Sequence, residues 1–146
     1  MRTAFEQFEV WRLYADPPYW QSWIAQWRKE FGEERVIEWF TTRTRQMENA
    51  IEGYDTAIKR STLSHAGQLE MERHIANACR REVSPAQGAE SALYVITKDR
   101  PDSPNKIDYA MAGVLSWEAR TDAVASGEDG QNPYLIHGVR RLGETE

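Results

Sequence analysis

The chain has little of what several classes of protein depend on. Its 146 residues include one cysteine, Cys79, which excludes an internal disulfide and a cysteine-rich metal finger and suits a reducing compartment. No apolar run approaches the roughly 18 residues of a membrane-spanning helix, and the N-terminus has no signal-peptide pattern. We therefore predict a soluble protein that is not exported, with Cys79 as a small buried side chain on a helix.

Basic charge and two binding motifs are also missing. The formal net charge is −5, which argues against a free-standing, non-specific nucleic-acid-binding protein, because such proteins usually carry a basic face. The sequence has no Gly-x-x-x-x-Gly-Lys-Ser/Thr phosphate loop and no histidine or cysteine spacing of a zinc site. A divalent metal is therefore expected to be held by oxygen atoms, which favours Mg²⁺ or Mn²⁺.

What the chain does have is an alternation of short strands and amphipathic helices. Three β-prone runs cover residues 10–15, 35–40 and 92–98, and apolar residues recur at helical spacing between them. One helix is predicted to end at about Arg80. This order predicts an α/β fold with a parallel crossover between the first two strands. The helix after the first strand has one apolar stripe, expected to be buried, of Trp20, Trp23, Ile24, Trp27 and Phe31.

The same pattern indicates one domain and a tail. Residues 1–126 form the predicted domain and residues 127–146 a flexible polar tail, in which the apolar run 134–136 is a candidate for docking. Residues 82–91 are predicted to be loop. The strand that begins at Val10 is expected to expose an unpaired sheet edge and aromatic surface, which is a route to self-association.

Asp108 is the first residue that needs a chemical explanation. It is the only charged side chain from Ile107 to Trp117, in a segment that otherwise resembles a core helix. A carboxylate that loses its water must be capped, paired or metal-bound. One interpretation is structural: Asn105 is the N-cap, Asp108 is its capping-box partner, and the acid suits the helix dipole. The other interpretation is a metal ligand.

Asp16 allows the same two interpretations. It ends the first predicted strand and precedes Pro17, so its carboxylate can cap the free amides at the start of the next helix. A carboxylate can also order a helix start with one oxygen and bind a cation with the other. The residue pattern alone leaves both roles open.

Two segments resemble a known family. Asn105-Lys-Ile-Asp-Tyr-Ala-Met-Ala112 followed by Ser116-Trp-Glu-Ala-Arg120 is similar to the C-terminal segment of the large subunit of tailed-phage terminases, above all the actinobacteriophage branch. These are the motor-nucleases that package and cut viral DNA. Tyr14-Ala-Asp-Pro-Pro-Tyr-Trp20 also resembles that family, in which a strand ending in Asp-Pro precedes an aromatic helix. The resemblance covers about residues 8–125.

The resemblance implies a partial ribonuclease-H-like fold and a metal-dependent nuclease site. It makes Asp16 the middle acid and Asp108 the last acid of the centre, both catalytic and both ligands of Mg²⁺ or Mn²⁺. In such a site, two cations about 4 Å apart activate water and stabilise the leaving oxygen when a phosphodiester is cut, and carboxylates bind the cations. The expected sheet is short and mainly parallel, flanked by helices and lacking its first strands. No strand before Trp11 supplies the earlier acid of the family's centre.

Four further polar residues are candidates for supporting roles. Lys98 and Lys106 flank the Asp108 segment, where each is either a phosphate ligand or a solvated loop lysine. His65 matches a family pattern in which an acid follows the histidine, but Ala66 stands in that place here. His74 is predicted to lie on a helix and to bond to a neighbouring loop.

The implied function is the later half of a phage terminase endonuclease domain. Its partners would be double-stranded viral DNA, the terminase small subunit and the portal, in the cytoplasm of the bacterial host and without a membrane. The parent would be a two-metal endonuclease, whereas this chain lacks the ATPase domain and the first-strand acid. The alternative is a non-catalytic remnant that acts as an interaction or regulatory module.

Overall fold

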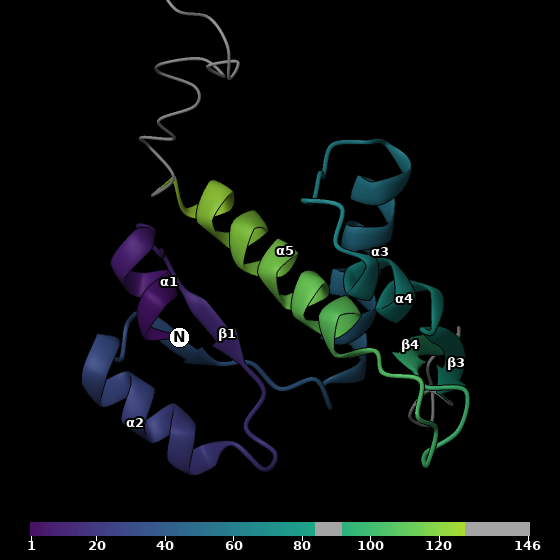
Figure 1. The fold of residues 1–146 in the computed structure, drawn as a ribbon, viewed down its shortest axis with the longest axis horizontal. Coiled ribbons are helices and arrows are strands. Elements are labelled where there is room, and N and C mark those ends of the chain that lie inside the picture. Colours follow the sequence, from purple (N-terminus) through teal and green to yellow (C-terminus); the bar gives the residue numbers. More distant parts are fainter. Residues whose placement is uncertain (84–91, 128–146) are drawn as a thin grey trace, which may run out of the picture.

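The computed structural model describes residues 1–83 and 92–127, and its first half is an α/β unit. The elements in order are α1 (Arg2–Gln7), β1 (Leu13–Ala15), α2 (Gln21–Phe31) and β2 (Val36–Glu38). β1 and β2 are parallel, so the predicted crossover is confirmed, with both strands shorter than expected. β1 ends before Asp16-Pro17, where proline provides no backbone N–H for a ladder. Figure 1 shows this unit at one end of the molecule.

The second half is mostly helical. It consists of α3 (Thr44–Lys59), α4 (Leu69–Ala76), β3 (Cys79–Val83), β4 (Leu93–Thr97) and α5 (Asp108–Ser126). The helix predicted to reach Arg80 ends at Ala76. Cys79 lies on β3 and is exposed, so its prediction as a buried helical residue is wrong. β3 forms because the whole of β4 pairs with it antiparallel, from Cys79 opposite Thr97 to Val83 opposite Leu93.

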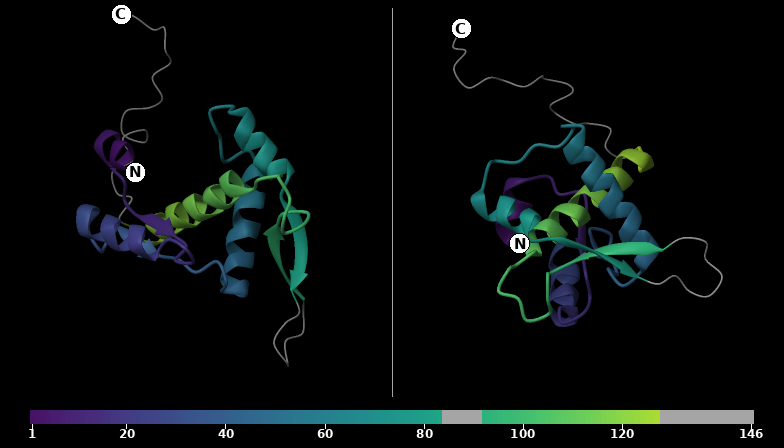
Figure 2. Two further views of the ribbon diagram at one scale, coloured as in Figure 1. Left: turned by 60° about the horizontal axis from the view of Figure 1, so that its bottom comes forward. Right: turned by 90° about the vertical axis from the view of Figure 1, so that its right-hand side faces the viewer.

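The predicted α/β class is confirmed, but the arrangement of strands differs from the prediction. The described residues form two separate two-stranded sheets, one of β1 and β2 and one of β3 and β4. The expected single, mainly parallel sheet is therefore wrong for this part of the chain. The physical reason is that β4 finds its hydrogen-bonding partner in β3, while α3 and α5 pack between the two sheets. Figure 2 shows the two sheets on opposite sides of these helices.

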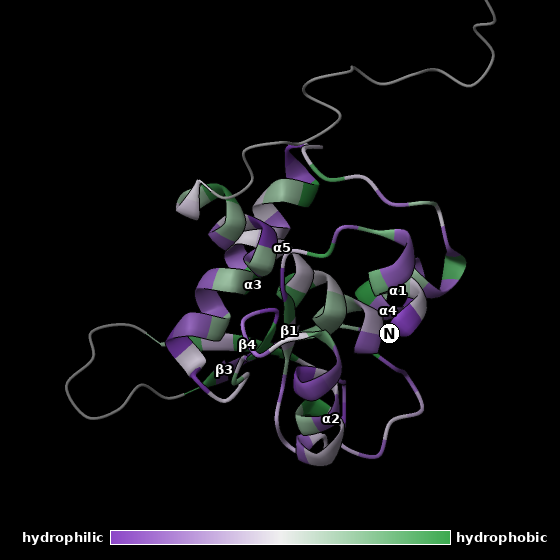
Figure 3. Cartoon of the chain, turned by 90° about the vertical axis from the view of Figure 1, so that its left-hand side faces the viewer, coloured by the Kyte–Doolittle hydropathy of each residue, from purple (hydrophilic) through white to green (hydrophobic). Residues whose placement is uncertain are grey.

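The core lies where α3 crosses α5. Gly113 of α5 is essential to this crossing, because a Cβ atom there would lie 2.5 Å from the hydroxyl oxygen of Tyr54 and 2.8 Å from its ring. Gly53 of α3 is less confined, since its added Cβ would lie 3.4 Å from Nε1 of Trp117. Figure 3 shows that both helices carry hydrophobic as well as hydrophilic residues along their length. The buried cluster consists of Trp39, Met47, Ala50, Ile51, Tyr54 and Val114.

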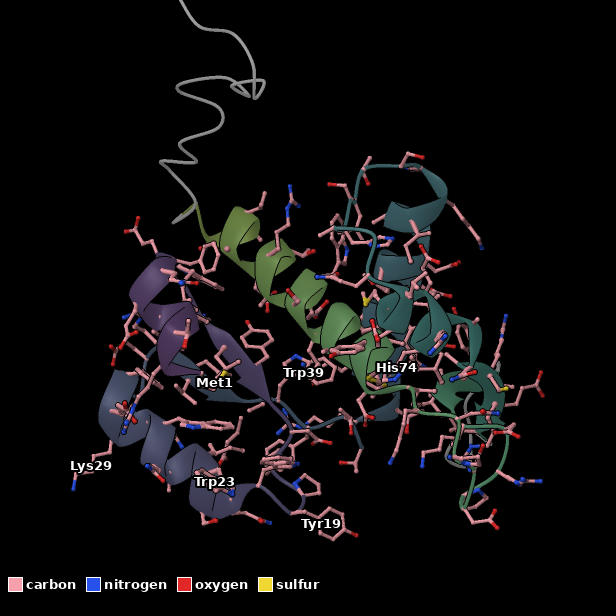
Figure 4. All side chains as sticks on the ribbon, in the orientation of Figure 1. Met1, Tyr19, Trp23, Lys29, Trp39 and His74 are labelled. Atoms are coloured by element: carbon pink, nitrogen blue, oxygen red, sulfur yellow. The ribbon has the colours of Figure 1, made fainter. Side chains whose placement is uncertain are left out.

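The apolar stripe of α2 is less buried than its periodicity predicts. Ile24 is the one residue of α2 that is buried, whereas Trp20 and Trp23 are 52% and 51% exposed. The indole of Trp27 stacks against that of Trp20 at 6.3 Å between ring centroids. Tyr19, just before α2, is 97% exposed, and it projects outward in Figure 4. The stripe is therefore a half-exposed aromatic surface.

Some predictions concern parts of the chain outside the described residues. Most of the predicted loop 82–91, the tail from residue 128 onward and the run 134–136 lie there. α5 ends at Ser126, where Gly127 takes the left-handed conformation (φ 71°) that glycine adopts without steric cost. Within residues 1–83 and 92–127, none of the helices has the length and apolar character needed to cross a bilayer.

Candidate functional site

A groove runs along β1. Its volume is about 780 Å³, and it lies between β1 and α5, with side chains of α2 at its border. Figures 1 and 3 both place β1 between α2 and α5. The groove is lined mainly by apolar side chains, including Trp11, Leu13, Trp20, Trp27, Met111, Leu115 and Ala119. Its polar lining includes both candidate acids, Asp16 and Asp108, although 92 positions separate them in the sequence.

Asp16 is fixed in the groove by Thr41. One carboxylate oxygen accepts the backbone N–H of Thr41 at 3.2 Å, and the other accepts its hydroxyl at 2.6 Å. The prediction that Asp16 caps α2 is not what the structure shows, because α2 begins at Gln21 and has no side-chain cap. The two bonds connect the ends of the parallel strands, since Asp16 follows β1 and Thr41 follows β2. They leave further lone pairs on both carboxylate oxygens.

Asp108 is the first residue of α5 and is exposed to solvent. The predicted capping box is wrong: Ile107 is the N-cap without a side-chain bond, and the backbone N–H of Asn105 is bonded to the hydroxyl of Ser103. Because the carboxylate remains hydrated, it needs no cap or ion-pair partner to offset a cost of burial. Its place in the first turn still suits the helix dipole. Within the described ranges, the Asp108 side chain makes no hydrogen bond or ion pair.

His74 of α4 and Asn77, the residue just after α4, hold the start of α5 in position. His74 accepts the backbone N–H of Tyr109 through Nδ1 at 3.0 Å, which satisfies one of the free amides of the first turn. Its ring also packs on that of Tyr109, with centroids 4.8 Å apart (Figure 4). Asn77 donates from Nδ2 to the carbonyl of Lys106 at 3.0 Å. A helix-borne, bonded His74 is thus confirmed, with its partner in the first turn of α5.

Tyr14 connects β1 to the far end of α5. Its hydroxyl donates to Oδ2 of Asp122 at 2.6 Å. Burial and, second, this bond raise the pKa of Tyr14 to about 12. One turn earlier on α5, burial and the charge of Asp122 raise the pKa of Glu118. This hydrogen bond therefore joins β1 to α5 beside the groove.

The three residues predicted to support the acids do not line the groove. His65 is exposed, and its Nδ1 accepts the backbone N–H of Gly67 at 3.1 Å. Lys98 donates from Nζ to the carbonyl of Ser103 at 3.3 Å, which ties the loop before α5. Lys106 is exposed, and its backbone carbonyl is the acceptor for Asn77. Arg12 and Arg120 are the basic residues that do line the groove.

Thr41 and Asn77 are functional positions that the sequence analysis missed. Thr41 makes two hydrogen bonds to Asp16, 25 positions away, and Asn77 makes one to Lys106, 29 positions away. For Thr41 a signal was available: it directly follows the second predicted strand, 35–40, and the carboxyl ends of parallel strands lie at one edge of their sheet. Asn77 follows a helix and gave no comparable signal.

The donor set of the groove suits a hard cation. Both candidate ligands are carboxylates, as Mg²⁺ and Mn²⁺ prefer, and both have unused lone pairs. In the ranges that the structure describes, no group of three or more histidine, cysteine, aspartate or glutamate side chains is close enough to hold a metal ion. The groove thus offers two oxygen ligands on different elements.

Comparison with protein-family models, with curated protein sequences and with solved structures found no match. The function proposed below therefore depends on the residues of the chain and on the shape of the groove.

Proposed function

We propose that the chain is the later half of the metal-dependent endonuclease domain of a phage terminase large subunit, which packages viral DNA and cuts it. The observation that carries the proposal is the presence of Asp16 and Asp108 at one groove. A capping role gives no reason for two acids so far apart in sequence to share a cavity. Their sequence contexts are also the two segments that resemble the terminase family, in which the nuclease centre has a ribonuclease-H-like fold.

Each charged residue of the groove has a distinct task in this function. Asp16, oriented by Thr41, and Asp108, at the solvent-exposed start of α5, would hold Mg²⁺ or Mn²⁺. The metal would supply Lewis acidity for cutting a phosphodiester bond. Arg12 and Arg120 line the same groove and can bind phosphate through their guanidinium groups. DNA is thus the expected substrate, despite the net negative charge of the chain.

A manganese titration followed by amide NMR tests the proposal. Paramagnetic line broadening is expected to centre on the amides near Asp16 and Asp108. Asp108→Asn removes the charge and keeps a side chain that is tolerated at a helix start, so it should abolish the broadening with little loss of fold. Asp99→Asn is the matched control, because Asp99 is an exposed loop carboxylate away from the groove. It should broaden as the wild type does.

The same variants test catalysis. With only two ligands from this chain, metal affinity should be weak and cleavage of DNA slow, and Mn²⁺ should serve better than Mg²⁺ because it is less strict about geometry. Broadening that is centred elsewhere, or that persists unchanged in Asp108→Asn, would show that the two acids are not ligands. The nuclease function would then be wrong for this chain.

A second candidate function is a non-catalytic interaction module. The half-exposed tryptophans of α2 favour it, because aromatic side chains are enriched at protein interfaces. It predicts binding of a partner without any response to divalent metal. The titration therefore separates the two candidates directly.

A further inference from the structure

The backbone of β1 has one edge that no described strand occupies. The N–H of Leu13 donates to the carbonyl of Arg35 at 2.7 Å, and the carbonyl of Ala15 accepts the N–H of Trp39 at 2.9 Å. Successive residues of a strand direct their backbone groups to opposite edges, so those of Tyr14 point away from β2. In the register of the sheet Tyr14 lies opposite Ile37, between the bonded positions Leu13 and Ala15, so its backbone groups lie outside the ladder with β2. An unpaired edge of this kind is a template for another strand.

The groove runs along this edge. Side chains alternate between the two faces of a strand, so Tyr14 lies on one face of β1 and Leu13 and Ala15 lie on the other. All three line the groove, as expected where a cavity borders a strand from the side. The free backbone groups of Tyr14 thus lie beside a mainly apolar space.

The groove is large enough to hold a ligand. Its volume is about 780 Å³. Apolar side chains line most of it, so filling it with water is unfavourable. Cavities of roughly 300–1,000 Å³ are the size that binds ligands.

The surroundings define what would fit. α5 lies on one side of β1 and α2 on the other (Figures 1 and 3), so an added strand would be covered on both faces. Strands covered on both faces are apolar along their whole length. A second copy is a poor fit, because its own β1 edge is recessed between its own helices. Arg12, just before β1, and Arg120 favour a carboxylate at that end of the groove.

We propose that this edge binds an extended peptide strand, apolar on both faces and acidic at the end next to Arg12 and Arg120, which pairs with the backbone of Tyr14 by β-strand addition. The strand would come from another polypeptide segment. This inference does not need the metal ligands, because it rests on the strand edge, the apolar lining and Arg12 and Arg120. The peptide would compete with DNA phosphate for these two arginines.

The test uses acetylated and amidated heptapeptides as probes. One is Glu-Glu-Val-Ile-Val-Leu-Val, and the second has the reversed sequence, which places the acids at the other end. The readout is hydrogen exchange at the Tyr14 amide of the full chain, with tryptophan fluorescence for the dissociation constant. We expect exchange at Tyr14 to slow at least tenfold at saturation, and one of the two directions to bind at least fivefold more tightly.

Backbone pairing is separated from general apolar attraction by N-methylation. Two versions of the tighter peptide are made. One carries N-methyl groups on its odd-numbered residues, and the other carries them on its even-numbered residues. Only one set of amides can face β1, so one version should bind within about threefold of the parent and the other at least tenfold more weakly. Equal effects of the two versions, in either direction, would overturn the proposal.

Variants of Tyr14 provide the protein side of the test. Tyr14→Pro removes the free N–H without touching the ladder bonds of Leu13 and Ala15, and proline is tolerated on such an edge. It should abolish binding, whereas Tyr14→Phe, which keeps the N–H, should bind as the wild type does. If Tyr14→Pro does not fold, the N-methylated pair decides. A protein that dimerises without peptide and thereby protects the Tyr14 amide would assign the edge to a second copy and overturn the proposal.

Discussion

Replacing Gly113 with alanine tests how closely α3 and α5 approach. In an open helix this change stabilises by about 1 kcal/mol, because glycine is the poorer helix former. Here the new Cβ would lie 2.5 Å from the hydroxyl oxygen of Tyr54 and 2.8 Å from its ring, well inside the ~3.5–4.0 Å of favourable contact. Tyr54 is 7% exposed and belongs to the core cluster, so it has little room to move. Overpacking typically costs about 1–3 kcal/mol.

The net expectation is that Gly113→Ala lowers the free energy of unfolding by about 1 kcal/mol, or the midpoint of thermal unfolding by about 2–4 °C. Urea and thermal unfolding followed by circular dichroism measure both. Gly53→Ala is the matched control: its Cβ would meet Trp117 at an ordinary 3.4 Å, so it should gain stability. Adding Tyr54→Phe to Gly113→Ala should restore part of the loss. A Gly113→Ala protein as stable as Gly53→Ala would refute the tight crossing, and with it the reason why α5 carries Asp108 to its observed place.

Two further predictions concern the hydrogen bonds that position α5. His74→Ala removes the acceptor of the Tyr109 N–H, so it should lower the free energy of unfolding by about 1 kcal/mol and speed amide exchange at Tyr109; an unchanged exchange rate would show that the bond is not made in solution. Tyr14 has a folded-state pKa of about 12 against an ordinary value of 10.0, so its contribution to stability is complete below pH 10 and is lost as the pH rises through 12. Tyr14→Phe should lack this loss when the free energy of unfolding is measured with urea between pH 9 and 12. If that free energy falls with pH equally steeply in both proteins, the prediction is contradicted.

Local patterns in the sequence predicted the elements better than their surroundings. The helical spacing of α2 and α3 and the parallel crossover were predictable, because each depends on neighbours a few residues away. The exposure of Trp20 and Trp23 was not, since periodicity shows which side chains share a face and not what covers that face. β3 was missed because four of its five residues are exposed and three of them are charged, so it has no apolar pattern of its own.

The candidate site divides in the same way. Asp16 and Asp108 could be singled out by their contexts, a proline after a strand and an otherwise uncharged helix. The sequence analysis did not assign their partners, because Thr41 and His74 contact Asp16 and the start of α5 from 25 and 35 positions away. The argument that Asp108 must lose its water was wrong for a simple reason: the first turn of α5 faces solvent, although the turns that follow are packed.

The two acids belong to halves of the molecule that need not open together. The core cluster draws most of its members from α3 and α5, whereas the unit that bears Asp16 meets it through Trp39, through Tyr14 and through the packing of β1 on α5. Such a unit can unfold locally while the rest persists, as hydrogen exchange reveals in other proteins. A ligand held by Asp16 and Asp108 together would join the halves into one cooperative unit. Its binding would therefore slow exchange across β1 and β2, far beyond the atoms that it touches.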